Sequence, residues 1–185
     1  WSSDVCSSDL DEKNVLVEVA SGTNWHCFVD WAIRNNYGGI ENLSLIPGNV
    51  GATPIQNIGA YGVELKDTFY SCLGVSLDNF EIKELKKSDC EFDYRSSIFK
   101  TKLKNRFIIT SVKFILSKTN HNFVIEYKGL KDNLLKTKLT LEKISQIKKC
   151  TTIGLAFSHQ KVNKINVENF DKKLDLILTE KLIQK

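Results

Sequence analysis

The sequence has little of several residues that normally indicate a function. Its 185 residues include no methionine, two prolines and only three arginines among 26 basic side chains. The missing methionine leads us to expect a chain cut at its start. A diffuse lysine-rich surface with a net charge of +4 is a poor signature of nucleic-acid recognition, which uses arginine forks and clustered aromatic rings. No apolar run approaches the ~20 residues of a membrane helix, so we expect no membrane partner.

Cysteine and histidine are also sparse. The five cysteines form no CxxC pair and are widely spaced, so we expect reduced thiols and a cytoplasmic location. The three histidines lack an HExxH motif or other regular ligand spacing, which predicts no metal site. With 42% hydrophobic and 26% charged residues, the chain has the composition of a soluble globular domain of ordinary size.

The first ten residues differ in character from the rest. Residues 1–10 read WSSDVCSSDL, nearly repeat themselves and show no apolar periodicity. We expect them to be a non-native, adapter-like leader outside the fold, and a natural disordered tail is the alternative. The expected domains are therefore the leader, a central domain over residues 11–149 and a divergent tail over residues 150–185.

Hydrophobic periodicity then predicts a mixture of strands and helices. Valines alternate with other residues from Asn14, which is typical of a strand with one buried face. A turn and N-cap at Ser21–Asn24 precede apolar residues at helical spacing from Trp25, and Gly38-Gly39 offers a stop. Residues 68–77 and 80–85 predict a hairpin that turns at Asp78-Asn79, and residues 106–116 predict the strongest strand.

Two helical faces are expected further on, one ending near Lys149 and one over residues 170–182. Strands in runs with occasional helices indicate an α+β fold.

The most informative stretch is Gly38–Gly62. It holds six of the ten glycines and both prolines, which indicates a shaped, rigid loop. Small and apolar residues with the amides of Gln56 and Asn57 would suit a flat aromatic ligand with a polar edge. The stretch matches neither a GxGxxG nor a GxxxxGK[ST] motif, and on the residues alone a tight buried crossover is an equally good interpretation.

A resemblance adds to this interpretation. ENLSLIPGNVGATPIQNIGAYGVEL, followed by CEFDYRSSIFK and RFIITSVKFIL, resembles the UDP-N-acetylenolpyruvoylglucosamine reductase family from about Val15 to Lys149. It implies an FAD-binding domain of the vanillyl-alcohol-oxidase/PCMH type that lacks its N-terminal part. It also implies the activity of a cytoplasmic oxidoreductase of peptidoglycan synthesis, which reduces UDP-N-acetylglucosamine enolpyruvate to UDP-N-acetylmuramate with FAD and NADPH. The implied partner is a small sugar nucleotide, and we expect a monomer.

The resemblance also implies site residues. Arg95 falls on the catalytic arginine, whose planar fork can hold a carboxylate and stabilise developing negative charge. Tyr94, Arg95 and Tyr127 are the implied substrate-binding residues. On the residues alone, the alternative interpretation is that Arg95 is a surface residue and that Tyr127 is a half-buried tyrosine at a strand end. The implied flavin-binding residues are Ile46, Pro47, Gly48, Gly51, Ala52, Thr53, Ile55, Gln56, Asn57, Ile58, Gly59, Ala60 and Ile109.

The sequence also departs from the family pattern. A glycine-rich pyrophosphate loop is missing before Asn14, and neither a GNAGSFFKNP-like serine motif nor the later glutamate segment follows Lys149. We therefore expect the chain by itself to be inactive and to retain no flavin. The alternatives are another FAD-dependent oxidoreductase of the same fold, and a non-catalytic flavin-domain fragment or scaffold. The segment Tyr94–Ser96 favours the reductase, since a related oxidase would have no reason to keep it.

Overall fold

The computed structural model describes residues 4–124, 140–142, 153–155, 176–178 and 183–184. The chain divides into two compact units, residues 1–147 and 148–185. The second unit contains the short strands β8 (Ile153–Leu155), β9 (Leu176–Leu178) and β10 (Ile183–Gln184). Strand β9 pairs with β8 in parallel and with β10 antiparallel. All further elements belong to the first unit, which carries the residues predicted for the site.

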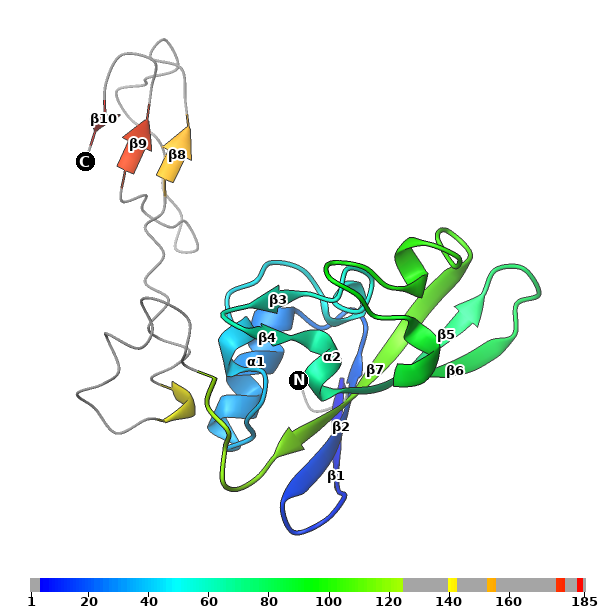
Figure 1. The fold of residues 1–185 in the computed structure, drawn as a ribbon, viewed down its shortest axis with the longest axis horizontal. Helices are drawn as coiled ribbons and strands as arrows, with labels where there is room; N and C mark the ends of the chain where they lie inside the picture. Colours follow the sequence, from blue (N-terminus) through cyan, green and yellow to red (C-terminus); the bar gives the residue numbers. More distant parts are fainter. Residues whose placement is uncertain (1–3, 125–139, 143–152, 156–175, 179–182, 185) are drawn as a thin grey trace. The chain divides into compact units, whose positions relative to one another are not determined.

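An antiparallel sheet forms the base of the first unit (Figure 1). Its order is β1-β2-β7-β5-β6, so the late strand β7 lies between two strands that precede it in the chain. Every neighbouring pair in it is antiparallel. The strands are β1 (Val5–Asp9), β2 (Asn14–Ala20), β5 (Phe69–Ser76), β6 (Ile82–Lys86) and β7 (Phe107–Ser117).

The alternation predicted from Asn14 is confirmed in β2. Val15, Val17 and Val19 are buried, and the residues between them are partly exposed. Strand β7 alternates in the same way, with Val112, Phe114 and Leu116 buried. Because side chains of a strand alternate between its two faces, both strands present one apolar face to the core.

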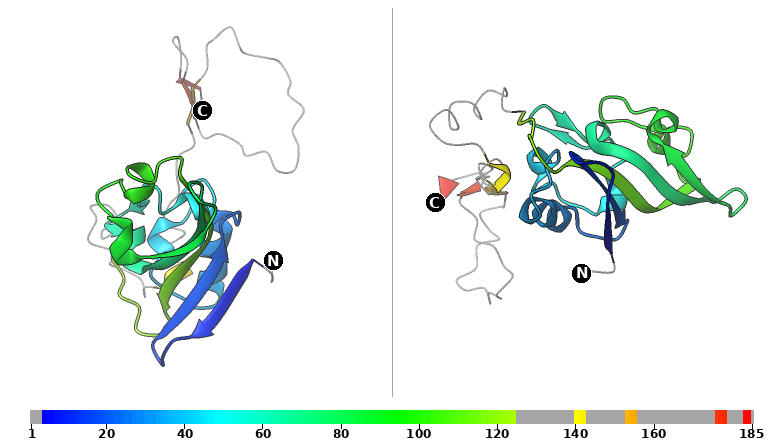
Figure 2. Two further views of the ribbon diagram at one scale, coloured as in Figure 1. Left: turned by 90° about the vertical axis from the view of Figure 1, so that its right-hand side faces the viewer. Right: turned by 90° about the horizontal axis from the view of Figure 1, so that it is seen from below.

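Helix α1 (Trp25–Arg34) covers that apolar face (Figure 2). Asn24 caps its start, since the Asn24 side chain accepts a hydrogen bond from the Cys27 N–H. The rings of Trp25 and Phe28 pack against Phe114 of β7, with centroids 6.0 and 5.1 Å apart. These aromatic contacts join the helix to the middle strand of the sheet, and Trp25 is fully buried in the core.

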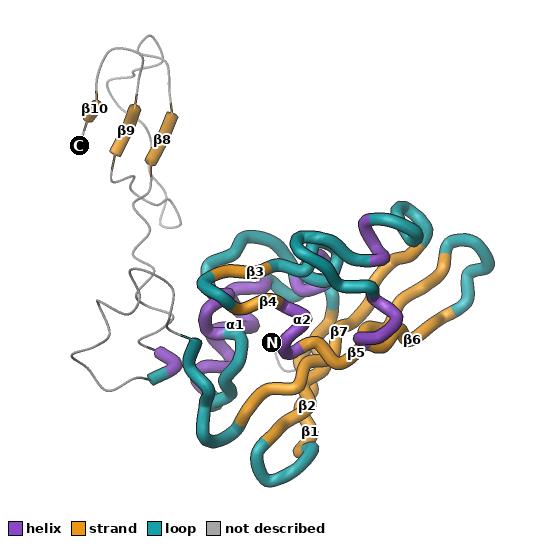
Figure 3. Tube along the Cα trace, in the orientation of Figure 1, coloured by secondary structure: helices purple, strands orange, loops and turns teal. Residues whose placement is uncertain are grey.

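The chain between α1 and β5 consists mostly of loops (Figure 3). It contains the two-stranded ribbon of β3 (Gly59–Ala60) and β4 (Val63–Glu64) and the short helix α2 (Leu65–Thr68). Single 3-10 turns lie at Glu41–Leu43 and Val50–Ala52, and two more follow β6 at Lys87–Cys90 and Ile98–Lys100. The Gly38–Gly62 stretch therefore folds as the shaped loop that its composition predicts.

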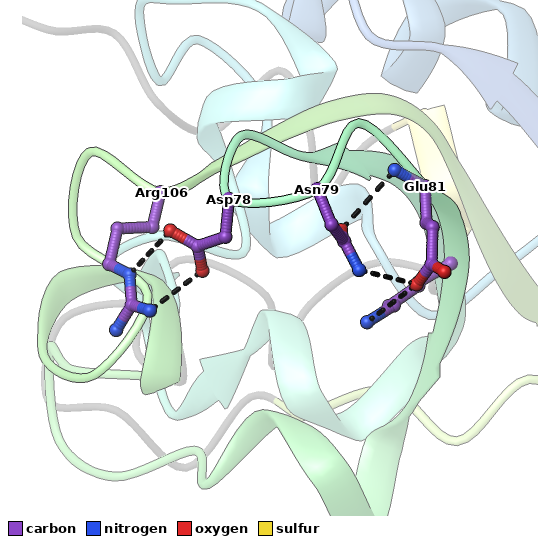
Figure 4. A network of polar contacts seen from close by, with 5 residues as sticks. Asp78, Asn79, Glu81 and Arg106 are labelled. Carbon is purple, nitrogen blue, oxygen red and sulfur yellow. Dashed lines mark hydrogen bonds and ion pairs between the residues drawn. The ribbon is translucent and has the colours of Figure 1, made fainter.

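The predicted hairpin is present and is closed by an ion pair. Strands β5 and β6 pair antiparallel. Arg106, which directly precedes β7, holds the carboxylate of Asp78 with two hydrogen bonds of 3.0 and 2.7 Å (Figure 4). The hydrogen bonding to Asp78 and the negative charge of the Asp78 carboxylate raise the pKa of Arg106. In the same turn, Asn79 donates to Glu81 and accepts from the Glu81 N–H. Arg106 therefore fastens the hairpin to β7.

Three expectations need correction. Residues 5–9 were expected outside the fold, but they form β1 and pair with β2. Four of these five residues are exposed, so the strand has no apolar alternation that the sequence could show. The non-native origin of residues 1–10 stays a prediction. Helix α1 ends at Arg34, and Asn36, with φ +58°, makes the turn expected of Gly38-Gly39. Leu176–Leu178, expected in a helix, is a strand, since a short apolar run suits either structure.

Other expectations fall partly outside the described residues. Leu141 and Glu142 are helical, but the rest of the helix expected to end near Lys149 lies outside them. Cys6, Cys27, Cys72 and Cys90 are free thiols, as the sequence predicts, whereas Cys150 is not described. A hydrogen bond with Cys90 and burial together raise the pKa of the Cys72 thiol. Among the helices that the structure describes, none is long and apolar enough to cross a membrane.

Candidate functional site

The glycine-rich loop is anchored to the turn between β2 and α1. The Trp25 N–H donates to the Gly48 carbonyl at 2.9 Å, and its buried indole Nε1 donates to the Leu43 carbonyl at 2.7 Å. The Val50 and Gly51 N–H groups donate to the carbonyls of Thr23 and Ser21. A Cβ atom at Gly51 would lie 2.5 Å from the Cβ of Ser21, so this close approach requires glycine. The loop is thus held rigidly at the edge of the core.

A first cleft of about 650 Å³ opens between this loop and β7. Four of the residues predicted to bind flavin line it: Gly51, Ala52, Ile55 and Ile109. Its other lining residues are Ser21, Asn49, Leu77, Phe99, Lys100, Leu103, Lys104, Asn105, Phe107 and Ile108. The cleft therefore has apolar walls with lysine and amide groups beside them, which suits a flat ligand that carries negative charge.

A second cleft of about 820 Å³ contains the predicted catalytic residue. Gly59 and Ala60, from the predicted flavin set, line it together with Tyr94 and Arg95. The remaining lining residues are Tyr61, Gly62, Val63, Glu64, Lys66 and Asp67. Both clefts take residues from the same glycine-rich loop. It places Asn49, Gly51, Ala52 and Ile55 in the first and its residues 59–62 in the second.

Arg95 reaches this loop directly. Its Nη2 donates to the Gly59 carbonyl at 2.5 Å, and its guanidinium lies 5.9 Å from the ring centroid of Tyr94. The Arg95 backbone has φ +51°, in a turn where the N–H groups of Asp93 and Ser96 each donate to the other's carbonyl at 3.1 Å. Lys100 Nζ donates to the Arg95 carbonyl at 3.0 Å. The structure thus brings the predicted catalytic residue against the predicted cofactor loop.

The partners of the three arginines distinguish Arg95 further. Arg34 pairs with Asp30 at 2.9 Å, and Arg106 pairs with Asp78 at 2.7 Å. Within the described residues, Arg95 pairs with no carboxylate. Tyr94 beside it is 78% exposed. A guanidinium bonded only to a neutral carbonyl keeps its charge free for an anion from solution.

Several predicted flavin residues lie elsewhere. Thr53, Asn57 and Ile58 are buried below the loop surface. Ile46 packs against the core, whereas Pro47, Gly48 and Gln56 are exposed and line neither of the two clefts. We expected the Asn57 amide to meet a ligand, but the structure uses both ends of that amide within the protein. Tyr127, the third predicted substrate residue, lies outside the described residues.

Sequence reasoning missed the charged residues of both clefts. Lys100 and Lys104 line the first, and they gave no signal because lysines are frequent throughout this sequence. Lys66 and Glu64 line the second and form an ion pair with each other. The hydrogen bond to Glu64 raises the pKa of Lys66, so this ammonium stays charged. Among the described residues, no three His, Cys, Asp or Glu side chains gather in a way that could hold a metal ion.

Comparisons with known proteins identify this class of domain. The family described as "FAD binding domain" matches residues 5–77. A crystal structure of UDP-N-acetylenolpyruvylglucosamine reductase from Thermus caldophilus is similar in fold, with a TM-score of 0.51 at 22% sequence identity. The match covers 71% of this chain and 42% of that one. The expected α+β fold of a flavin-binding domain is thereby confirmed.

The sequence relatives are more specific. A UDP-N-acetylenolpyruvoylglucosamine reductase of Flavobacterium johnsoniae is 50% identical over 130 residues, which are 70% of this chain and 39% of the relative. One of Pseudomonas putida is 41% identical over 138 residues, or 73% of this chain and 40% of the relative. Over these residues the chain belongs to the UDP-N-acetylenolpyruvoylglucosamine reductase family, and it spans about two fifths of the length of these relatives.

Proposed function

We propose that this chain is the central flavin-binding part of a reductase that converts UDP-N-acetylglucosamine enolpyruvate to UDP-N-acetylmuramate, a peptidoglycan precursor. NADPH is the proposed reductant and FAD the proposed cofactor. We place the enzyme in the cytoplasm as a monomer, with a small sugar nucleotide as its partner and neither a membrane nor nucleic acid. The observation that carries the proposal is Arg95, the arginine without a carboxylate partner among the described residues, hydrogen bonded to the predicted cofactor loop.

The first cleft fits the proposed cofactor. Its volume of about 650 Å³ is within the usual range for small-molecule sites, and Ala52, Ile55 and Ile109 supply apolar walls for a flat ring. FAD bound there would supply hydride transfer. The residues of this chain would hold the ring and keep water from its faces.

Arg95 would bind the carboxylate of the enolpyruvyl group. As hydride adds to the alkene, negative charge spreads onto that carboxylate, and a fixed guanidinium stabilises it more in the transition state than in the ground state. Tyr94 would flank the same group, since its exposed ring lies beside the guanidinium. Tyr127 remains a proposed substrate residue by resemblance.

A chimera tests this function. The 130 aligned residues of this chain would replace their counterparts in the Flavobacterium johnsoniae relative, and NADPH oxidation that depends on the enolpyruvyl sugar nucleotide would be measured. We expect turnover in the chimera and none from the 185-residue chain alone. Arg95→Lys in the chimera should lower kcat about 100-fold, because the second prong of the fork is lost.

Arg34→Lys is the matched control. Arg34 forms an exposed ion pair with Asp30 on helix α1, and this substitution should leave kcat unchanged. A folded, FAD-loaded chimera without turnover, or an Arg95→Lys chimera as active as its parent, would contradict the proposal. Flavin-dependent oxidation of another substrate by the same chimera would favour a different oxidoreductase of this fold.

A further inference from the structure

The buried amide of Asn57 links the cofactor loop to the turn that carries Arg95. Asn57 is 0% exposed and has φ +43°, a left-handed conformation that asparagine tolerates better than most residues. Its Nδ2 donates to the Asp93 carbonyl at 3.1 Å, and its Oδ1 accepts from the Lys66 N–H at 3.0 Å. One side chain thereby joins the cofactor loop to the turn of Asp93–Ser96 and to helix α2.

A second hydrogen bond also joins the cofactor loop to the segment that carries Arg95. The Ser97 hydroxyl donates to the Ile55 carbonyl at 2.7 Å, and Ser97 is 2% exposed. Residues 55 and 57 of the loop therefore hold residues 97 and 93, which lie on either side of Arg95. The Arg95 side chain adds its own bond to Gly59.

We propose that Asn57 is a positioning residue, which fixes the turn of Asp93–Ser96 so that the Arg95 guanidinium points into the second cleft. The importance of this role for catalysis rests on the proposed function. The positioning itself can be tested separately, because the orientation of the Arg95 side chain can be measured with or without a ligand. Ser97 assists Asn57 from the other side of the turn.

The energetics favour this role over simple filling of the core. A buried amide with both ends bonded is stable, but removing one partner leaves a buried polar group unsatisfied, which is unfavourable. The Arg95 backbone is itself in a left-handed conformation, which the surrounding contacts must maintain. Loss of the Asn57 bond to Asp93 should therefore release the turn locally.

The scarcity of arginine makes a direct test possible. An NMR spectrum of the full chain should contain three arginine Nε–Hε signals, and Arg95→Lys would identify that of Arg95. The ¹⁵N heteronuclear NOE of this signal measures how restricted the side chain is. Asn57→Gly keeps the left-handed backbone and removes the amide, whereas Asn57→Asp keeps the acceptor for Lys66 and removes the donor to Asp93.

Both variants should lower the NOE of Arg95 and leave those of Arg34 and Arg106 unchanged. Asn120→Gly is the matched control, since Asn120 is exposed with a similar φ of +52°. Phosphoenolpyruvate, a small enolpyruvyl carboxylate, should shift the Arg95 signal of the wild type. Its affinity should fall about tenfold in the Asn57 variants, as expected from the loss of one structural hydrogen bond.

An Arg95 NOE equal to the wild-type value in a folded Asn57 variant would overturn the inference. Equal loss of order at all three arginines would also overturn it, because it would indicate general loosening of the fold. If both Asn57 variants unfold, Ser97→Ala takes their place and should loosen Arg95 alone. If phosphoenolpyruvate leaves the wild-type Arg95 signal unmoved, the proposed function fails, while the NOE comparison still tests the positioning.

Discussion

At the scale of single residues, Arg106 and Arg95 carry the same charge but have different partners. Arg106 gives two hydrogen bonds to Asp78 and closes a hairpin, whereas Arg95 gives one to a neutral carbonyl. The local sequence could not distinguish the roles of these two residues, because both are isolated arginines in a lysine-rich chain. Only the family resemblance pointed to Arg95, and only the structure shows that its charge has no carboxylate partner within the described residues.

Glu84 should make the stability of the fold depend on pH in the acidic range. Hydrogen bonds from the Ser71 hydroxyl and from Lys113 lower the pKa of this carboxyl. A lowered folded-state pKa stabilises the fold above the unfolded value of about 4.3, and this stabilisation is lost as the pH falls through the folded value. Since 41% of the side chain is exposed, solvent screening limits the effect to about 1 kcal/mol.

Glu84→Gln tests this prediction. The variant should be less stable than the wild type in urea unfolding at pH 7, and the difference should shrink at pH 3, because the stabilisation declines once the pH falls below the unfolded value of about 4.3 and toward the lowered folded-state pKa. A difference that stays constant between these two pH values would show that the charge of Glu84 contributes nothing.

At the scale of elements, β5 and β7 pack so closely that Gly74 has no room for a side chain. Gly74 lies where the register of the two strands shifts, and a Cβ atom there would collide with the Phe107 ring and the Ile108 carbonyl. We expect Gly74→Ala to destabilise the fold by about 2 kcal/mol, because the obstructing carbonyl is backbone and belongs to the sheet. Gly22→Ala is the control, since a Cβ there has nothing within 4 Å. Urea unfolding of both variants would measure this, and equal stability would contradict it.

The elements also show what could be predicted from the sequence. Strands β2 and β7, helix α1 and the β5-β6 hairpin were predicted because local alternation and capping residues mark them. Strand β1 was not, since an exposed edge strand is held by its backbone and shows no apolar pattern. The two clefts could not be derived from local pattern at all, because residues 51–60, 93–97 and 107–109 meet only through tertiary contacts.

At the scale of the whole molecule, the buried core that the structure describes belongs to the first unit. Its apolar residues extend from Val15 to Leu141, inside residues 1–147. We therefore expect a chain of residues 1–147 to unfold at the same temperature as the full chain, within about 2 °C, in a circular dichroism melt. A midpoint lower by about 5 °C or more, which corresponds to roughly 1 kcal/mol or more in a domain of this size, would show that residues 148–185 support the first unit.

The position of β7 has a consequence for how the protein is made. This strand pairs with β2 on one side and β5 on the other, yet it is synthesised after both. Until the ribosome has delivered Ser117, the two earlier strands lack the neighbour that joins them. Their hydrogen-bonding edges are then open to other nascent chains, and joining them late requires contacts between distant residues, which form slowly. The first cleft, whose wall includes residues 107–109, can form only after β7, the last strand of this sheet to be synthesised, is inserted.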